Sequence, residues 1–372
     1  MAAVLRTGAS ATGGAEQARL EWLPEIVAFA DGVFRASGRG SMAGDYPCLF
    51  DPGNVEHLFV HREHGRIAGL AGALPCDLLL DGRPVRAAGI GSVATAPHLR
   101  GHGVASRLLG LAEEALRHEG CRLLLISGGR GLYRRFGAVR VGSVRWYRLD
   151  RPLAVGSRWT VTRLRRDGLS AAAQLYDRRR TRYVRTPAAL DRLFAAAGFA
   201  AAEQGEQAGF LASDGVELRA YAIVVSGARH HPDVQLVSEW AGDPDGLAAI
   251  FDAVLRAGGG AVLVPLLDAD AELAERLPGS SAVPREPFPY TVKVIDGVGL
   301  WEDLGLGAGG ALGERSPGVY TLGVGDVART LGAAGLTSLL FGHTSAIESW
   351  PPPALPEVLP VPFVWPQGLN YV

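Results

Sequence analysis

The chain has 372 residues, of which 48% are hydrophobic and 20% are charged, and this balance is typical of a globular protein with a sizeable core in two or three domains. Its 37 basic and 38 acidic residues give a formal net charge of -1, so no basic excess indicates nucleic acid or a membrane surface as a partner. Cys48, Cys76 and Cys121 have neither metal-ligand nor disulfide spacing. Without a signal-peptide core or an apolar run of membrane-spanning length, we expect a cytoplasmic protein.

The first unit, residues 1–150, alternates helical and strand patterns. Apolar spacing over residues 22–37 predicts a helix, and the stretch that follows it reads as strands. The turn pairs Gly65-Arg66 and Asp81-Gly82 predict antiparallel hairpins there. The later elements are expected to be a helix from Val104 to His118, an apolar strand over 121–127, a helical turn over 131–138 and a strand over 143–150.

Residues 151–290 repeat that order, so we predict an internal duplication at the scale of a domain. The expected elements are helices between Leu164 and Ala197, a hairpin around Asp214-Gly215, a strand over 234–240, a helix over 245–260 and a strand over 261–267. The two copies differ where the strand turns into the main helix, because the second has Asp243 and Asp245 at that point. Carboxylates cap the free N–H groups of a helix start and repel a phosphate.

The third region, residues 291–372, predicts a strand over 292–296 and a helical segment, interrupted by glycines, over 323–342. It ends in a proline-rich tail with apolar side chains up to Val372. Disordered tails are usually polar and charged. We therefore expect this tail to pack against the body of the protein.

The stretch Arg100-Gly-His-Gly-Val-Ala105 stands between a predicted buried strand and the helix from Val104. The first N–H groups of a helix have no partner within the helix, and the helix dipole adds partial positive charge. Glycines at 101 and 103 let the backbone approach a ligand, and Arg100 supplies a full positive charge. The pattern predicts a pyrophosphate site; the Gly-Lys-Ser/Thr of a P-loop is absent, and the preceding antiparallel strands fit a Rossmann unit poorly.

These residues resemble the Arg/Gln-x-x-Gly-x-Gly/Ala signature of the GNAT acyltransferases, and Val-Ala-Thr-Ala-Pro before them is similar to the strand end of that family. Residues 131–138, GLYRRFGA, resemble its Tyr-x-x-Phe-Gly segment, with the tyrosine at Tyr133. The duplication and the extra C-terminal region resemble the Eis-type branch (enhanced intracellular survival). The resemblance implies an α/β (α+β) fold with two tandem GNAT-like domains, 1–150 and a degenerate 151–290, each a mixed, mostly antiparallel sheet flanked by helices. It implies a third region, 291–372, which is shorter than the sterol-carrier-like domain of that branch.

The resemblance also implies acetyl-CoA as the donor, with its pyrophosphate on the glycine loop. The residues expected to bind it are Val93, Ala94, Thr95, Arg100, Gly101, His102, Gly103, Val104, Ala105 and Ser106. Backbone N–H groups between Ser92 and Thr95 are the candidates for the oxyanion site, with the hydroxyls of Ser92 and Thr95 as the alternative. His230-His231 lacks a second ligand pair, so no metal is expected.

Acetyl transfer to an amine needs a group that takes the amine proton and one that protonates the departing thiolate. Tyr133 is the candidate acid, because a phenol with a pKa near 10 keeps its proton at neutral pH; the alternative is an ordinary half-buried aromatic. The resemblance suggests the terminal carboxylate of Val372 as base, while a tail that only packs is the alternative. Asp45, Asp51 and Glu56 are further acidic candidates, either as base or to orient a cationic substrate.

The leading hypothesis is therefore an acetyl-CoA-dependent N-acetyltransferase that modifies a small cationic amine, such as an aminoglycoside or a polyamine. Two alternatives stay open: a CoA-binding sensor or scaffold without catalysis, and an enzyme that acetylates a protein N-terminus or lysine. An enclosed pocket beneath the tail would disfavour a bulky protein substrate. A homo-oligomer is left open by the sequence.

Overall fold

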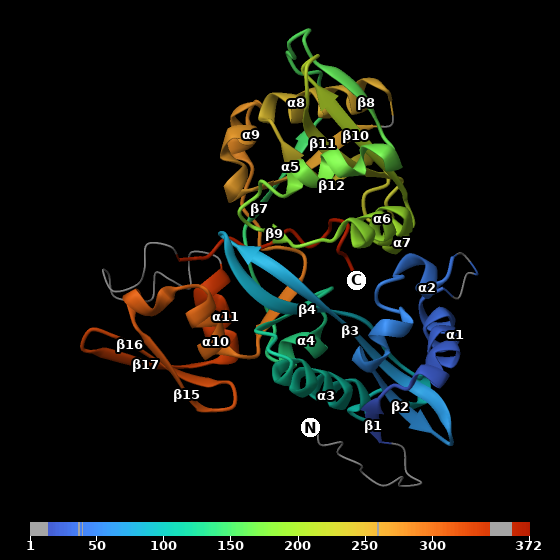
Figure 1. Ribbon diagram of the computed structural model, residues 1–372, viewed down its shortest axis with the longest axis vertical. Coiled ribbons are helices and arrows are strands. Elements are labelled where there is room, and N and C mark those ends of the chain that lie inside the picture. The colour runs from blue at the N-terminus through green and yellow to red at the C-terminus, as the bar shows by residue number, and fades with distance from the viewer. Residues whose placement is uncertain (1–13, 36–37, 39, 259, 343–358) are drawn as a thin grey trace.

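The computed structural model describes residues 14–35, 38, 40–258, 260–342 and 359–372. Two large sheets form two lobes, and a small third sheet lies to one side of them (Figure 1). The C-terminus of the chain lies in the space between the two lobes (Figure 1). This arrangement confirms the expected α/β fold of two sheets flanked by helices.

The first sheet has eight strands. Seven lie in the order β1 (Ala15–Gln17), β2 (Leu58–Glu63), β3 (Arg66–Leu80), β4 (Arg83–Thr95), β5 (Leu123–Ile126), β14 (Thr291–Val294) and β6 (Val139–Arg140), while β9 (Arg182–Tyr183) pairs with β3. Its helices are α1 (Leu23–Phe34), α2 (Met42–Asp45), α3 (Val104–His118) and α4 (Gly131–Arg135). The hairpins predicted at Gly65-Arg66 and Asp81-Gly82 are confirmed, since β2, β3 and β4 pair antiparallel.

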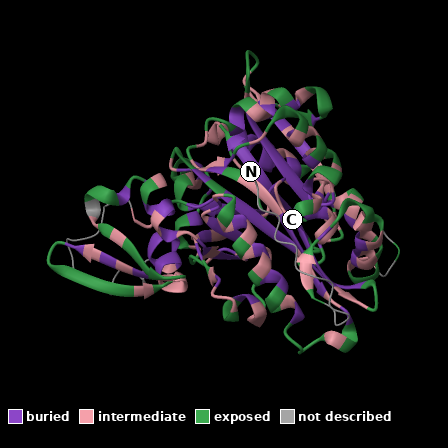
Figure 2. Cartoon of the chain, turned by 60° about the horizontal axis from the view of Figure 1, so that its bottom comes forward, coloured by how far each residue is buried: buried purple, intermediate pink, exposed green. Residues whose placement is uncertain are grey.

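The second sheet has six strands and repeats this plan. Their order is β7 (Val144–Leu149), β13 (Ala261–Leu267), β12 (Val234–Gly242), β11 (Leu218–Ser226), β10 (Glu206–Ser213) and β8 (Thr160–Leu164). The helices of this lobe are α5 (Leu169–Tyr176), α6 (Pro187–Ala196), α7 (Gly198–Ala202), α8 (Pro244–Arg256) and α9 (Ala271–Glu275). In each lobe one parallel pair of strands, β4 with β5 and β12 with β13, is joined through the main helix, α3 or α8. Buried residues follow the strands of both sheets, as Figure 2 shows.

The two sheets exchange strands with the segments around them, which the sequence pattern does not show. The strand expected at the end of the first unit, β7, pairs with β13 in the second sheet. The strand expected in the third region, β14, pairs with β5 and β6 in the first sheet. The sheets therefore cross the predicted boundaries at 150 and 290, because an apolar strand can join either sheet and its partners are distant in sequence.

The third region corrects one prediction. Residues 323–342 were expected to be helical, but β15 (Ala311–Ser316), β16 (Val319–Val324) and β17 (Val327–Gly332) form an antiparallel sheet, and only α11 (Ala333–Phe341) is helical. A turn at Gly325-Asp326 joins β16 to β17, with Gly325 at φ +57°. A Gly-Asp pair between two strands is a hairpin signal. Residues 323–332 therefore belong to a hairpin of strands here, although the spacing of their apolar residues is helical. Helix α10 (Gly297–Asp303) packs beside this sheet.

The C-terminal tail packs as expected over its described part, residues 359–372. Val361, Phe363, Val364 and Leu369 are buried. The ring of Phe363 lies edge-on to that of Phe341, with 4.8 Å between centroids. The tail is therefore held by buried apolar contacts, and its end lies in the space between the lobes.

Candidate functional site

Strands β4 and β5 separate near the middle of the first sheet. Their parallel pairing ends at Ile90 and Ile126, where the amide of Ser127 still donates to the carbonyl of Ile90 over 3.4 Å. Strand β4 then continues alone on that side to Thr95, while remaining paired with β3 on its other side. The separation opens backbone groups of β4 toward the start of α3.

A β-bulge lies in the separated part of β4. Ser92 and Val93 stand opposite the single residue Ala71, because the pairing moves from Gly72–Gly91 to Leu70–Ala94. Ser92 has φ +53°, which is strained for a residue other than glycine. Such strain is concentrated at functional sites. Of the residues expected to form the oxyanion site, Ser92 and Val93 therefore lie in the bulge, while Ala94 and Thr95 pair with β3.

The start of α3 has open space at Gly101 and no side chain that caps it. Gly101 and Gly103 adopt φ +82° and +76°, and no atom would lie within 4 Å of a Cβ at Gly101. Gly103 is the N-cap residue and provides no side-chain hydrogen bond to the first turn. Arg100 Nε donates to the carbonyl of Thr95 over 3.3 Å, which holds this side chain beside the end of β4. This geometry fits a pyrophosphate.

The corresponding helix of the second lobe, α8, is capped by its own chain. Asp243 accepts hydrogen bonds from the amides of Asp245 and Gly246 over 2.9 and 3.1 Å. These amides are therefore unavailable to a ligand, and the carboxylate would repel an anion. Of the two helix starts, only that of α3 has no capping side chain.

We expect Gly101→Asp to weaken CoA binding about tenfold relative to Gly101→Asn. Both variants impose similar backbone strain at φ +82°, whereas only aspartate adds a negative charge beside the diphosphate. Isothermal titration calorimetry with CoA measures the difference. Equal dissociation constants for the two variants would contradict the placement of the diphosphate.

Tyr133 lies on α4, buried against the α3 side of the sheet. Its ring is close to the loop after β5, since its Cε2 would be 3.8 Å from a Cβ at Gly128. Burial raises the pKa of Tyr133, and nearby Arg130 lowers it less. The phenol therefore keeps its proton at neutral pH, as a general acid requires.

The C-terminal residue lies directly on β4, before the bulge. A Cβ at Gly91 would be 2.6 Å from the carboxyl carbon of Val372, and one at Gly89 would be 2.6 Å from its Cγ2. Both glycines are needed, because any larger side chain would displace the end of the chain. The pattern Gly-x-Gly inside a strand is a sequence signal for such close approach of backbone.

Val372 borders a cavity of about 900 Å³ between the lobes. One wall is the face of the first sheet opposite α3, with Leu74, Cys76, Gly89 and Leu125. The other wall comes from the second sheet. Its lining residues there are Trp146, Arg148, Val234, Leu236 and Leu263. A molecule in this cavity can therefore meet the separated strands from the side away from α3.

Sequence reasoning missed several polar residues of this cavity. Tyr371 lines this cavity next to Val372, where burial raises its pKa, the charge of Glu203 raises it further, and a hydrogen bond with Ser127 lowers it. Glu203 accepts a hydrogen bond from His230 Nδ1 over 2.9 Å. These residues come from separate elements, so no sequence motif joins them.

A buried ion pair holds the tail in place. Arg185 donates to both carboxylate oxygens of Glu239 over 2.8 and 2.6 Å and to Asn370 Oδ1 over 2.5 Å. Glu239 also accepts from the amide of Leu369 and from the hydroxyl of Tyr221, over 2.9 and 2.8 Å. Burial alone would raise the pKa of Glu239, but Arg185 and these donors lower it overall. Glu239 therefore remains a carboxylate that binds the tail two to three residues before its end.

We expect Asn370→Ala to loosen the chain end, because it removes a charge-assisted hydrogen bond worth about 1.5–3 kcal/mol. Turnover should fall about tenfold, and carboxypeptidase should release Val372 faster than from the wild type. The conservative variant Asn370→Asp retains the acceptor oxygen and should restore resistance. An unchanged release rate in Asn370→Ala would contradict the anchoring role.

The acidic residues proposed from the sequence lie away from the large cavity. Asp45 pairs with Arg35 over 2.6 Å and borders a small cleft next to Tyr371 and Val372. Asp51 accepts from the amide of Gly53 and pairs with Arg192 over 2.6 Å, and these two partners lower its pKa. Glu56 is exposed. The structure does not bring these three carboxylates together.

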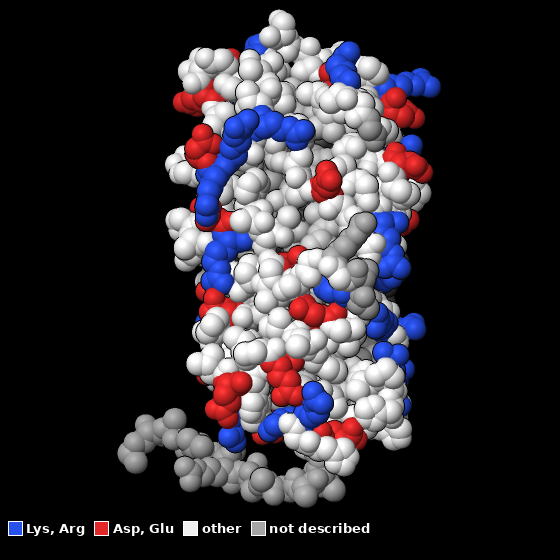
Figure 3. Space-filling view, turned by 90° about the vertical axis from the view of Figure 1, so that its right-hand side faces the viewer, with Lys and Arg blue, Asp and Glu red and all other residues white. Residues whose placement is uncertain are grey.

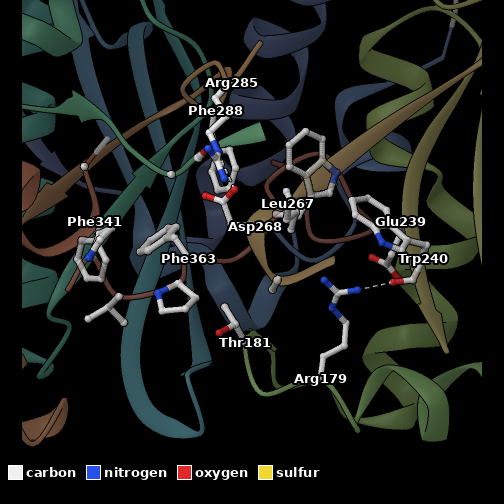
Figure 4. A pocket seen from close by; sticks show the side chains of 18 of the residues that line it. Arg179, Thr181, Glu239, Trp240, Leu267, Asp268, Arg285, Phe288, Phe341 and Phe363 are labelled. Carbon is white, nitrogen blue, oxygen red and sulfur yellow. Dashed lines mark hydrogen bonds and ion pairs between the residues drawn. The ribbon is translucent and has the colours of Figure 1, made fainter. Parts of the chain in front are cut away.

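A second cavity of about 450 Å³ lies behind the tail and does not reach the separated strands. Figure 4 shows its aromatic walls and Arg179, which donates to the carbonyl of Trp240 over 3.2 Å. Its other arginine, Arg285, pairs with Asp268 over 2.9 Å. This smaller cavity touches neither Val372 nor the bulge.

No three His, Cys, Asp or Glu side chains in the described part of the chain are placed to share a metal ion. No helix among these residues is long and apolar enough to span a bilayer. On the face in Figure 3, basic and acidic side chains are interspersed, and neither kind covers the whole face.

Comparisons with known proteins agree with this geometry. Residues 17–140 match the family model described as "Acetyltransferase (GNAT) domain". No curated protein matches the sequence significantly.

Solved structures match over nearly the whole chain. A GCN5-related N-acetyltransferase from Anabaena variabilis is 15% identical, with a TM-score of 0.69 over 97% of this chain and 100% of that one. Another, from Kribbella flavida, is 16% identical, with a TM-score of 0.63 over 97% and 99%. Eis1 from Mycobacterium abscessus is 15% identical, with a TM-score of 0.64 over 97% and 100%.

The family match covers the lobe that contains the uncapped helix start, the bulge and Tyr133. The structural matches extend the likeness in fold to both lobes and the third region. Residues 17–140 therefore match an acetyltransferase (GNAT) domain, and the fold of the whole chain is similar to those of the GCN5-related N-acetyltransferases and of Eis1.

Proposed function

We propose that the protein is an acetyl-CoA-dependent N-acetyltransferase that transfers acetyl to a primary amine of a small acceptor by direct attack in a ternary complex. The observation that supports this most is the position of the terminal carboxylate. It lies against Gly91, beside the bulge of β4 and at the edge of a large cavity. The donor would be held by the α3 start on one side of the sheet, and the acceptor by the cavity on the other.

Acetyl-CoA supplies an activated acetyl thioester, and the residues that would bind its diphosphate are Arg100, the glycine loop from Gly101 to Gly103, and the first amides of α3. The N–H groups of the bulge at Ser92 and Val93 are suited to bind the oxygen of a tetrahedral intermediate. Tyr133 would protonate the leaving thiolate, because its raised pKa keeps the phenol protonated.

The acceptor amine must lose its proton before it attacks. For an alkyl amine with a pKa near 10.4, the neutral form at pH 7 costs about 4.6 kcal/mol. The carboxylate of Val372 is the candidate base, and Glu203 lies on the same cavity to attract the ammonium group. Cys76 also lines this cavity, but burial raises the pKa of its thiol to about 12. An acetyl-cysteine intermediate is therefore disfavoured.

The alternative of a protein substrate has less support. The cavity lies between two lobes, and the C-terminal tail forms part of its border, so a small amine fits better than a folded protein surface. A sensor that binds CoA without catalysis would leave the strained bulge and the placement of the terminal carboxylate without a role.

Thiol release from acetyl-CoA, followed with a thiol reagent, tests the proposal. A panel of aminoglycosides, alkyl diamines and amino acids is added in turn, and the product is identified by mass spectrometry. We expect amine-dependent release with a mass increase of one acetyl group on the acceptor. Tight CoA binding without release for any amine would instead favour the sensor.

A further inference from the structure

The charges of the large cavity are nearly balanced, which does not suit a polycation. Its carboxylates are Glu203, Glu286 and the terminal carboxylate of Val372, and its fixed cations are Arg140 and Arg148. A small acceptor with several ammonium groups would meet both arginines. An acceptor with one ammonium group and one acid group would find a partner for each.

The two arginines are free to bind a ligand. Among the described residues, neither guanidinium has an ion-pair or hydrogen-bond partner, whereas both arginines of the smaller cavity are paired. Arg140 lies at the end of β6 and extends toward the loop after β5, since its Nη2 would be 3.3 Å from a Cβ at Gly129. Arg148 belongs to the opposite lobe. The arginines therefore approach the cavity from two sides.

The strand pattern explains why Arg148 faces the cavity. Side chains two apart on a strand share a face, so Trp146 and Arg148 point to the same side of β7. Leu263, the cross-strand neighbour of Arg148, and its own partner Leu236 line the same wall. An arginine in an otherwise apolar wall offers a two-point contact for a carboxylate.

We propose that the acceptor is an amino acid-like molecule, in which a primary amine and a carboxylate are joined by an apolar body. The amine lies toward Val372 and Glu203, and the carboxylate binds Arg140 and Arg148. The apolar body contacts the walls formed by Leu125, Leu236 and Leu263. This inference rests on the proposed function and narrows its substrate class.

The test compares ω-amino acids of four to eight carbons with their ω-amino amides and with diamines of equal length. Each compound is titrated into the full-length, CoA-bound protein by calorimetry. We expect the best ω-amino acid to bind about tenfold more tightly than its amide and its diamine. Arg140→Gln and Arg148→Gln should each reduce this preference several-fold, whereas Arg145→Gln, on the other face of β7, should preserve it.

Equal affinity for acid and amide, tighter binding of the diamine, or no binding by any compound would overturn the inference. So would a preference for the acid that survives in both Arg140→Gln and Arg148→Gln. Failure of the proposed function gives a different result: the ω-amino acid binds with the expected preference, but it does not stimulate thiol release from acetyl-CoA.

Discussion

Adding Gly-Ser after Val372 is expected to lower kcat about a hundredfold. The extension moves the terminal carboxylate away from Gly91 and removes the candidate base, and general bases contribute about 10²–10⁴ to the rate. The KM for acetyl-CoA should change little, because the start of α3 lies on the other side of the sheet. Steady-state thiol release per folded protein measures both parameters.

The matched control for this extension is Val372→Ala, which retains the terminal carboxylate and removes only the methyl groups that pack over Gly89. It should keep most of the turnover. An extended protein with wild-type kcat would show that the tail contributes only packing, and the amine would then need another base.

Tyr133→Phe is expected to lower kcat by about a hundredfold while CoA still binds with wild-type affinity. The substitution removes one hydroxyl and leaves the ring in the core next to α3. Because burial raises the pKa of Tyr133 above its ordinary value of 10, the phenol is protonated below that pKa and loses its proton only above it. The wild-type rate should therefore hold up to the ordinary phenol pKa of 10 and fall only at more alkaline pH, and this loss should be absent from the residual rate of Tyr133→Phe.

Tyr147→Phe is the matched control, because it removes a hydroxyl that donates to the carbonyl of Pro278 over 3.0 Å, and Tyr147 lies in the second sheet, on the face of β7 opposite Trp146 and Arg148. Its kcat should equal that of the wild type. A Tyr133→Phe protein with wild-type kcat would reduce Tyr133 to an ordinary core aromatic. A parallel loss in both variants would indicate a general effect on stability.

The glycine loop and the helix after it were predictable because their chemistry is local. The uncapped start of α3, the positive φ of Gly101 and Gly103 and the contrast with Asp243 all depend on neighbouring residues. Tyr133 was proposed for the same reason, because it lies in a short segment that resembles the Tyr-x-x-Phe-Gly segment of the GNAT family.

The polar residues of the large cavity could not be predicted in that way. Glu203, Arg140, Arg148 and Tyr371 belong to different elements, and only the packing of the two lobes brings them to one cavity. The acidic residues chosen from the sequence, such as Asp51, instead pair with arginines such as Arg192 that are distant in the chain. The close approach of Val372 had a visible signal in Gly89 and Gly91, but the signal does not say which segment fills the space.

By itself, the sequence determined the local features of this protein: the order of most elements, the hairpins, the duplication and a helix start suited to a diphosphate. Only the tertiary structure decided that β7 and β14 join sheets across the predicted boundaries and that the tail ends on β4. It also decided which charged residues line the large cavity. The physical reason is that backbone geometry and capping depend on adjacent residues. Strand partners and ion pairs depend instead on which segments, distant in sequence, pack together and bury their apolar side chains.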